Sequence, residues 1–301
     1  MMDAKTAFLS TRPWSFTMTF SSVTLGVLLA AIAGRFNPLF YALTLVGMIA
    51  FHAATNVLND FYDVKHGVDR EGAPTTKYRV HPAAFGQVPL STTLAFSVGL
   101  YTVTLATGVY LALASSTFIL LVIAAGIAGS VFYTADPVDL KARSLGEPTV
   151  FIMWGLLIPL GAYMVQTGTF AWAPLLASVP VGIFVVLVLL ANNIRDIGYD
   201  GTVRERTLAV ALGPRRAQRL YVVLLALAYT VVAVGILVEQ LPAWSLLVFI
   251  TVPGALRLAK MFHGRVPDDA DPRTAALAFQ FSLLYMASFA LFILVPITLP
   301  I

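Results

Sequence analysis

Residues 56–69 read NVLNDFYDVKHGVD and lead from an uncharged apolar segment, residues 36–58, into an acidic loop. At 100° per residue of an α-helix, Asn56, Asn59, Asp60 and Asp63 fall within about 100° of arc, so one helix face is polar. An ionisable side chain costs about 2.5–3.5 kcal/mol at the centre of a membrane helix. This acidic face therefore predicts a polar cavity at the end of a membrane-spanning helix.

A second segment repeats the arrangement. Residues 192–210 read NNIRDIGYDGTVRERTLAV, and Asn192, Asp196 and Asp200 share a face within about 80° at spacings of four. Carboxylate and amide oxygens are hard ligands of the kind that Mg²⁺ prefers, with waters and substrate phosphates completing its shell. Two such faces opposite each other predict a site for Mg²⁺ and a diphosphate. We also expect Gly67 to end the first helix, so that the loop carries Asp69 back towards this site.

The composition places both segments in a membrane protein. Only 11% of the 301 residues are charged and 58% are hydrophobic, whereas a soluble domain carries about 25% charged residues. The chain has no cysteine, which excludes disulfide scaffolds, thiolate metal sites and cysteine nucleophiles. The small basic excess, 19 Lys and Arg against 15 Asp and Glu, is explained by membrane topology, so we expect no nucleic-acid partner.

Charge-free segments predict nine membrane-spanning helices. A spanning helix needs about 20 mostly apolar residues, and two of the uncharged runs are long enough for two helices each. The resulting fold class is an all-α, polytopic bundle of nine transmembrane helices around a central cavity open to the cytoplasmic face, forming one domain over residues 1–301. The segments are residues 13–34, 36–58, 86–135 (two helices, broken near residues 114–116), 148–194 (two, broken near Gly168), 220–238, 241–256 and 274–301.

The basic residues give this bundle an orientation. Lys and Arg in short loops stay on the cytoplasmic side, and in the nine-helix arrangement only Arg35 is left for the opposite face. We therefore expect the N-terminus and the acidic motifs at the cytoplasmic face of the plasma membrane. Among the acidic residues only Glu239 falls outside, and a polar site on the cytoplasmic face explains this segregation.

The two motifs resemble those of the UbiA superfamily of intramembrane prenyltransferases, which have nine transmembrane helices and Asp-rich motifs after helices 2 and 6. The family's first motif, NDxxDxxxD, appears from Asn59, but position 67 is glycine and the third Asp is Asp69. That spacing resembles the dihydroxynaphthoate branch, as do TRPWSF from Thr11, LGEP from Leu145, NNIRD from Asn192 and RTLAVALG from Arg206. Relatives in that branch usually carry Gly-Lys before the TLAV string, where this chain has Arg204-Glu205-Arg206.

The resemblance implies roles for individual residues. The implied Mg²⁺ ligands are Asn59, Asp63, Asp196 and Asp200; the implied catalytic residues are Asp60, Asp63, Asp196, Asp200 and Tyr133. Cationic and hydroxyl groups are expected to bind the diphosphate, with three supporting members nearby. The diphosphate-binding candidates are Arg12, Lys65, Thr134, Lys141, Arg195, Arg204 and Arg206, and the supporting residues are Asn56, Asp69 and Asn192.

The implied reaction is Mg²⁺-dependent transfer of a polyprenyl group from its diphosphate to an aromatic acceptor within the lipid bilayer, with 1,4-dihydroxy-2-naphthoate, in menaquinone biosynthesis, as the first choice. Acceptors of the 4-hydroxybenzoate, homogentisate and archaeal glycerol-phosphate types remain alternatives. A membrane transporter is the alternative from another class, although transporter sites usually lie near the bilayer midplane on broken helices. A CDP-alcohol phosphotransferase shares Asp196-x3-Asp200-Gly201 but needs a further Asp pair that is missing after Gly213.

Overall fold

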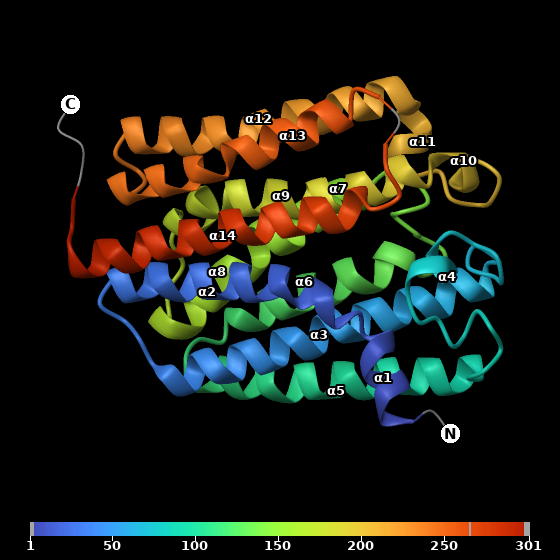
Figure 1. Cartoon of the computed structure of the whole chain (residues 1–301). Coiled ribbons are helices and arrows are strands. Elements are labelled where there is room, and N and C mark those ends of the chain that lie inside the picture. The colour runs from blue at the N-terminus through green and yellow to red at the C-terminus, as the bar shows by residue number, and fades with distance from the viewer. Residues whose placement is uncertain (1–2, 265, 298–301) are drawn as a thin grey trace.

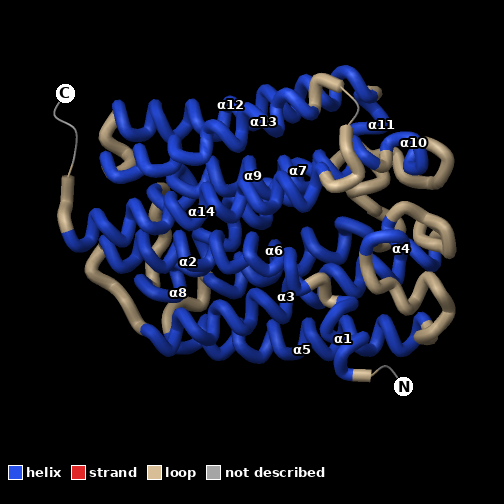
Figure 2. Tube along the Cα trace, viewed as in Figure 1, coloured by secondary structure: helices blue, strands red, loops and turns tan. Residues whose placement is uncertain are grey.

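A computed structural model describes residues 3–264 and 266–297 and shows an all-helical bundle (Figures 1 and 2). Within these residues the chain forms no β-strand, in agreement with the predicted fold class. The elements are α1 Ala4–Ser10, η1 Pro13–Ser15, α2 Phe16–Ile32, α3 Pro38–Lys65, α4 Thr75–Tyr78, α5 Leu90–Ala114, α6 Ile119–Thr134, α7 Gly146–Val150, η2 Phe151–Leu157, α8 Ile158–Thr167, α9 Ala173–Arg195, α10 Ile197–Asp200, α11 Leu208–Leu212, α12 Pro214–Leu237, η3 Ala243–Thr251, α13 Val252–Met261 and α14 Ala270–Leu294.

Eight helices of the described chain are long and apolar enough to cross a membrane. They correspond to eight of the nine predicted spans. The remaining predicted span is α6, Ile119–Thr134, an apolar helix of 16 residues. At 1.5 Å per residue it is about 24 Å long, short of the roughly 30 Å hydrocarbon core. The prediction of nine full-length spans is thus confirmed for eight. The end of the last predicted span, residues 298–301, lies outside the described residues.

Helix α3 is longer than the segment predicted from charge alone. It begins at Pro38, where the Asn37 side chain accepts hydrogen bonds from the backbone N–H groups of Leu39 and Phe40, and it ends at Lys65. Gly67 then adopts a positive φ of 73°, and the backbone N–H of Asp69 donates to the carbonyl of Asp63 at 3.1 Å. The acidic motif therefore lies on the last turns of the helix, and Gly67 returns the chain as expected.

The bundle has a central layer and two flanks. Helices α2 and α9 lie in the middle with the η2–α8 helix, where α2 packs on α8 and α9 packs on η2. On one side α3 packs against α5, and α6 joins them; on the other side α12 and α14 pack against α9, and η3–α13 packs against α12 and α14. The largest core cluster joins α9 to α12 and α14 around Phe184, Tyr221 and Phe281, all nearly inaccessible to solvent.

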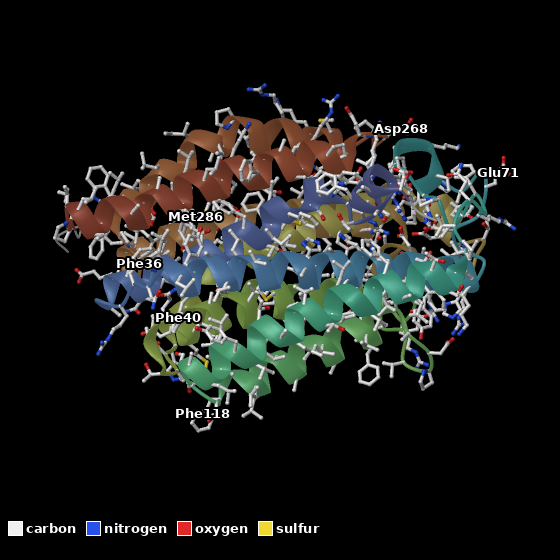
Figure 3. The ribbon with its side chains drawn as sticks, turned by 90° about the horizontal axis from the view of Figure 1, so that it is seen from below. Phe36, Phe40, Glu71, Phe118, Asp268 and Met286 are labelled. Carbon is white, nitrogen blue, oxygen red and sulfur yellow. The ribbon has the colours of Figure 1, made fainter. Side chains whose placement is uncertain are left out.

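The two ends of the bundle differ. The C-terminal end of α3 lies at the same end as α4, α10 and α11, and this end carries long polar loops (Figure 1). Figure 3 shows Glu71 and Asp268 at this end, while Phe36 and Phe118 lie towards the other. The loops at residues 66–89 and 196–213 therefore close over the ends of the two helices that carry the acidic motifs.

Candidate active site

A cavity of about 610 Å³ lies between the ends of α3 and α9. Side chains of both acidic motifs line it, together with residues from the loops that follow α6, α9 and the first acidic motif. The two motifs, more than 130 residues apart in sequence, thus face one common cavity. The predicted site residues that line it are Arg12, Asn56, Asn59, Asp63, Asp69, Tyr133, Lys141, Asn192, Arg195, Asp196 and Asp200.

The first motif presents Asn59 and Asp63 to this cavity. They are one helical turn apart on α3, and Asn59 Nδ2 donates to Asp63 Oδ2 at 2.8 Å. The other carboxylate oxygen of Asp63 accepts from the Lys141 ammonium. Asn59 also donates to the hydroxyl of Thr134, a fully buried residue at the end of α6, at 3.3 Å. The buried hydroxyl of Thr134 therefore orients the side-chain amide of Asn59, which lines the cavity.

Asp60 and Asp69 form a separate buried ion network. Each oxygen of Asp60 accepts from Arg79 at 2.9 Å, and Arg12 pairs with the same carboxylate. Asp69 lies 3.2 Å from Arg79 and 2.7 Å from Nε2 of His81. One ligand atom each from Asp60, Asp69 and His81 fall within 4.8 Å of one another, but two guanidinium groups already neutralise these carboxylates.

This network fixes the loop over the cavity. Burial would raise the pKa of Asp69, but the hydrogen bond from His81 and the charge of Arg79 outweigh it and hold that pKa well below its usual value. Asp60 does not line the cavity within the described chain. The structure thus pairs Asp60 and Asp69 with Arg12, Arg79 and His81, and it places Asp60, which the resemblance implied to be a catalytic residue, outside the cavity lining.

Arg195 and Tyr78 hold Asp196 of the second motif in place. Arg195 Nη2 lies 2.7 Å from Asp196 Oδ2, and the Tyr78 hydroxyl donates to the same oxygen at 3.1 Å. The Tyr78 ring stacks against the Arg195 guanidinium at 4.2 Å. Arg195 also donates to Asn192 Oδ1 at 2.7 Å. Asp196 and Arg195 are therefore fixed relative to each other at the mouth of the cavity.

Asp200, one turn beyond Asp196 on α10, occupies a strongly acidic environment. Burial, and then the neighbouring carboxylates of Asp196 and Glu205, raise the pKa of Asp200 to about 8. On the same short helix the Tyr199 hydroxyl donates to the carbonyl of Val68 at 2.7 Å, which ties this helix to the loop of the first motif.

Lys141 joins the two halves of the site. Its Nζ pairs with Asp63 and lies 3.1 Å from Glu205 Oε1. Burial alone would lower the pKa of Lys141, but the carboxylates of Asp63 and Glu205 raise it above its ordinary value, so this ammonium is charged. Tyr133 lines the cavity nearby. Asn59, Asp63, Asp196 and Asp200 thus provide only oxygen donors around one cavity, a set whose chemistry fits Mg²⁺.

Four predicted diphosphate-binding residues do not line the cavity of the described chain: Thr134, which contacts Asn59 from behind it, and three residues at the surface. The Lys65 ammonium is 5.1 Å from the centre of the Tyr62 ring on the exposed side of α3. The Arg204 side chain is 51% exposed and pairs with Asp136 at 2.9 Å. Arg206 is exposed, and its carbonyl accepts from the Ser144 hydroxyl. The turn between α10 and α11 points both arginines outward, and none of the three lines the cavity in the described chain.

Comparison with known proteins identifies the family. The UbiA prenyltransferase family matches residues 19–298. The chain belongs to the UbiA prenyltransferase family. The resemblance seen in the two motifs is therefore confirmed, and with it the expectation of a prenyltransferase, whereas the transporter and the CDP-alcohol phosphotransferase are set aside.

Two relatives of this UbiA family member cover most of its length. It is 29% identical over 257 residues to the 1,4-dihydroxy-2-naphthoate octaprenyltransferase of Bacillus subtilis, covering 84% of this chain and 80% of the relative. It is 30% identical over 284 residues to human UbiA prenyltransferase domain-containing protein 1, covering 92% of this chain and 81% of the relative.

Solved structures confirm the UbiA fold. A UbiA homolog from Aeropyrum pernix K1 aligns with a TM-score of 0.72 at 18% identity, covering 91% of this chain and 97% of that one. A homolog from Archaeoglobus fulgidus, described as bound to DMAPP and Mg²⁺, aligns with a TM-score of 0.67 at 15% identity, covering 93% and 99%.

The candidate active site contains three residues that the sequence motifs did not identify as members of the site. Tyr78 contacts Asp196, His81 contacts Asp69, and Glu205 contacts Lys141. His81 and Glu205 are nearly inaccessible to solvent. All three belong to loops or to a single helical turn, where no periodicity predicts which way a side chain points.

Proposed function

We propose that this protein transfers a polyprenyl group from an isoprenyl diphosphate to an aromatic acceptor, with Mg²⁺ as cofactor. The observation that carries the proposal is the single cavity that receives Asn59 and Asp63 from one motif, Asp196 and Asp200 from the other, and Lys141 between them. The A. fulgidus structure described as bound to DMAPP and Mg²⁺ supports the cofactor and the donor class.

The residues that would hold Mg²⁺ are Asn59, Asp63, Asp196 and Asp200. When bound there, the ion supplies positive charge that neutralises the diphosphate as it leaves the allylic carbon. Lys141, Arg195 and Arg12 all line the cavity and bring cationic donors to it. These groups stabilise negative charge that develops on the departing oxygen, which is where electrostatic catalysis has its effect.

Most of the deeper wall of the cavity is apolar, although His52, Thr55 and Ser130 also line it. Phe51, Met153, Trp154, Val185 and Val188 line it below the acidic motifs. Such a surface suits an isoprenoid chain and keeps water from the allylic cation, and Tyr133 lines the same cavity. The bond from C1 to the diphosphate oxygen breaks with its electron pair on the diphosphate, and an electron-rich aromatic carbon then forms the new bond to C1.

For the acceptor we propose 1,4-dihydroxy-2-naphthoate. The name of the B. subtilis relative and the position of Asp69, two residues later than in the family's first motif, support this choice. Attack by the carbon that bears the carboxylate is followed by loss of CO₂, whose bonding electrons restore the aromatic ring. No protein base is then required to remove a ring proton. A product of this kind belongs to menaquinone biosynthesis.

We propose that the protein acts as one domain over residues 1–301 in the plasma membrane. The site opens to the cytoplasm and the N-terminus lies on the same side. The distribution of basic residues supports this orientation, and the cavity lies at the end of the bundle that carries most of the charged loops.

A product assay tests the proposed function. Purified protein in lipid receives geranylgeranyl diphosphate, Mg²⁺ and either 1,4-dihydroxy-2-naphthoate or 4-hydroxybenzoate, and mass spectrometry identifies the product. We expect a prenylated naphthoquinol without its carboxyl group, formed only when EDTA is absent. A prenylated benzoate alone would contradict the acceptor, and failure with every aromatic acceptor would contradict the function.

Two variants connect this activity to the acidic motifs. Asp63→Ala and Asp196→Ala each remove a proposed Mg²⁺ ligand, so we expect each to lower turnover by at least about 10²-fold, the scale on which lost electrostatic groups act. Glu71→Ala, which changes an exposed carboxylate in the same loop region, should retain wild-type activity. Wild-type turnover by either motif variant would remove the metal assignment.

A further inference from the structure

Lys141 lies between two carboxylates, and only one of them belongs to an acidic motif. It leaves the loop after α6 and enters the cavity, where its Nζ contacts Asp63 of α3 and Glu205 of the turn between α10 and α11. The side chains of Lys141 and Glu205 are 11% and 7% exposed. A charged group at such depth is stable only when a partner of opposite charge is present.

The two partners of Lys141 have different tasks. Asp63 is a proposed Mg²⁺ ligand, so its charge would be shared with the ion when the ion is bound. Glu205 is not one of the proposed Mg²⁺ ligands, and it contacts Lys141 through its own carboxylate oxygen at 3.1 Å. An ammonium held by Asp63 alone would compete with Mg²⁺ for the same carboxylate, because both cations need its oxygens.

We propose that Glu205 is a positioning residue that holds Lys141 in the cavity, facing the diphosphate, when Asp63 binds the metal ion. This inference rests on the proposed function and adds a residue from the segment Arg204-Glu205-Arg206, whose arginines point outward. Glu205 acts through Lys141 and does not itself contact the reacting carbon.

Binding of inorganic diphosphate tests the inference without any acceptor. Calorimetry on the full chain in detergent measures the Kd of diphosphate at saturating Mg²⁺ and, separately, the Kd of Mg²⁺ alone. We expect Glu205→Gln to weaken both by about tenfold, the effect of losing one charge-assisted contact. Glu205→Asp keeps the charge and should restore most of the affinity. Glu71→Gln is the matched control and should bind as the wild type does.

A double variant separates positioning from a general structural effect. If Glu205 acts through Lys141, then Glu205→Gln should have no further effect on the Kd of diphosphate in a Lys141→Met background. Additive losses in the double variant, wild-type binding by Glu205→Gln, or no recovery in Glu205→Asp would each overturn the proposal. Should Lys141→Met not fold, the comparison of Glu205→Gln with Glu205→Asp decides the question.

This experiment also separates the inference from the proposed function. One outcome is that the protein binds diphosphate and Mg²⁺ in a way that depends on Glu205 and yet prenylates no aromatic acceptor. That result would support the positioning role of Glu205 and would reject the proposed acceptor class. Prenyl transfer that is unchanged in Glu205→Gln, together with unchanged binding, would reject the positioning role and leave the function standing.

Discussion

At the scale of single residues, the protonation state of Asp200 controls the affinity of the proposed site for Mg²⁺. Its pKa is raised to about 8 by burial and by the neighbouring carboxylates, so below that pH the carboxyl group carries a proton in the folded protein. A metal ion must displace this proton in order to bind. We therefore expect Mg²⁺ to bind more tightly as the pH rises towards 8, by up to about tenfold per pH unit, and to level off above it.

Calorimetric titration with Mg²⁺ alone at pH 6, 7, 8 and 9 checks this expectation. Titrations in two buffers with different ionisation enthalpies report the number of protons released, which should approach one below pH 8 and fall above it. Omitting the diphosphate keeps its own ionisation out of the result. An affinity that does not change between pH 6 and 8 would show that Asp200 does not exchange a proton for the ion.

At the scale of helices, a close glycine contact holds the centre of the bundle. A Cβ atom at Gly182 on α9 would lie 2.6 Å from the Cα atom of Gly155 on η2. The backbone of η2 offers no flexible end that could move aside. We expect Gly182→Ala to destabilise the protein by about 1–3 kcal/mol, the usual effect of overpacking.

The midpoint of thermal unfolding in detergent measures this loss. Gly99→Ala on α5 is the control, because a Cβ atom there would meet nothing within 4 Å. Replacing this glycine removes a poor helix former and should leave the midpoint unchanged or slightly higher. Equal midpoints for Gly182→Ala and the wild type would mean that α9 and η2 are farther apart than the structure places them.

The whole molecule has one strongly charged end. Helix α1 lies nearer to the end that carries α4 and α10, while α14 ends at the opposite end (Figure 1). The basic loops predict that the end with α4 and α10 faces the cytoplasm. The absence of cysteine allows single cysteines to report on each end. We expect Gln240→Cys to react with a membrane-impermeant maleimide in intact cells, and Glu71→Cys to react only after permeabilisation.

Both positions are exposed, so a lack of labelling would not arise from burial. Prenyl transfer by each variant confirms that it is folded. Labelling of Glu71→Cys from outside, with Gln240→Cys protected, would reverse the orientation and place the site on the other face of the membrane.

The amino-acid sequence determined the membrane class, the positions of eight spanning helices, the two acidic faces and the family. Hydropathy and helical periodicity are local properties, because each span must be apolar over its own length and each polar face repeats every turn. For the same reason the spacing alone places Asn59 and Asp63 on one polar helix face and Asp196 and Asp200 on another, whereas their role as metal ligands is implied by the family resemblance.

The tertiary structure decided which charged groups meet. Asp60 and Asp63 are three residues apart on one helix, yet their surroundings differ. Asp60 forms ion pairs with Arg12 and Arg79, whereas Asp63 lines the cavity. In the turn after α10, Glu205 points inward and its two arginine neighbours point outward. The free energy of burying a carboxylate depends on a cation supplied from elsewhere in the chain, and the path of a loop has no sequence period that would bring Lys141 to Glu205.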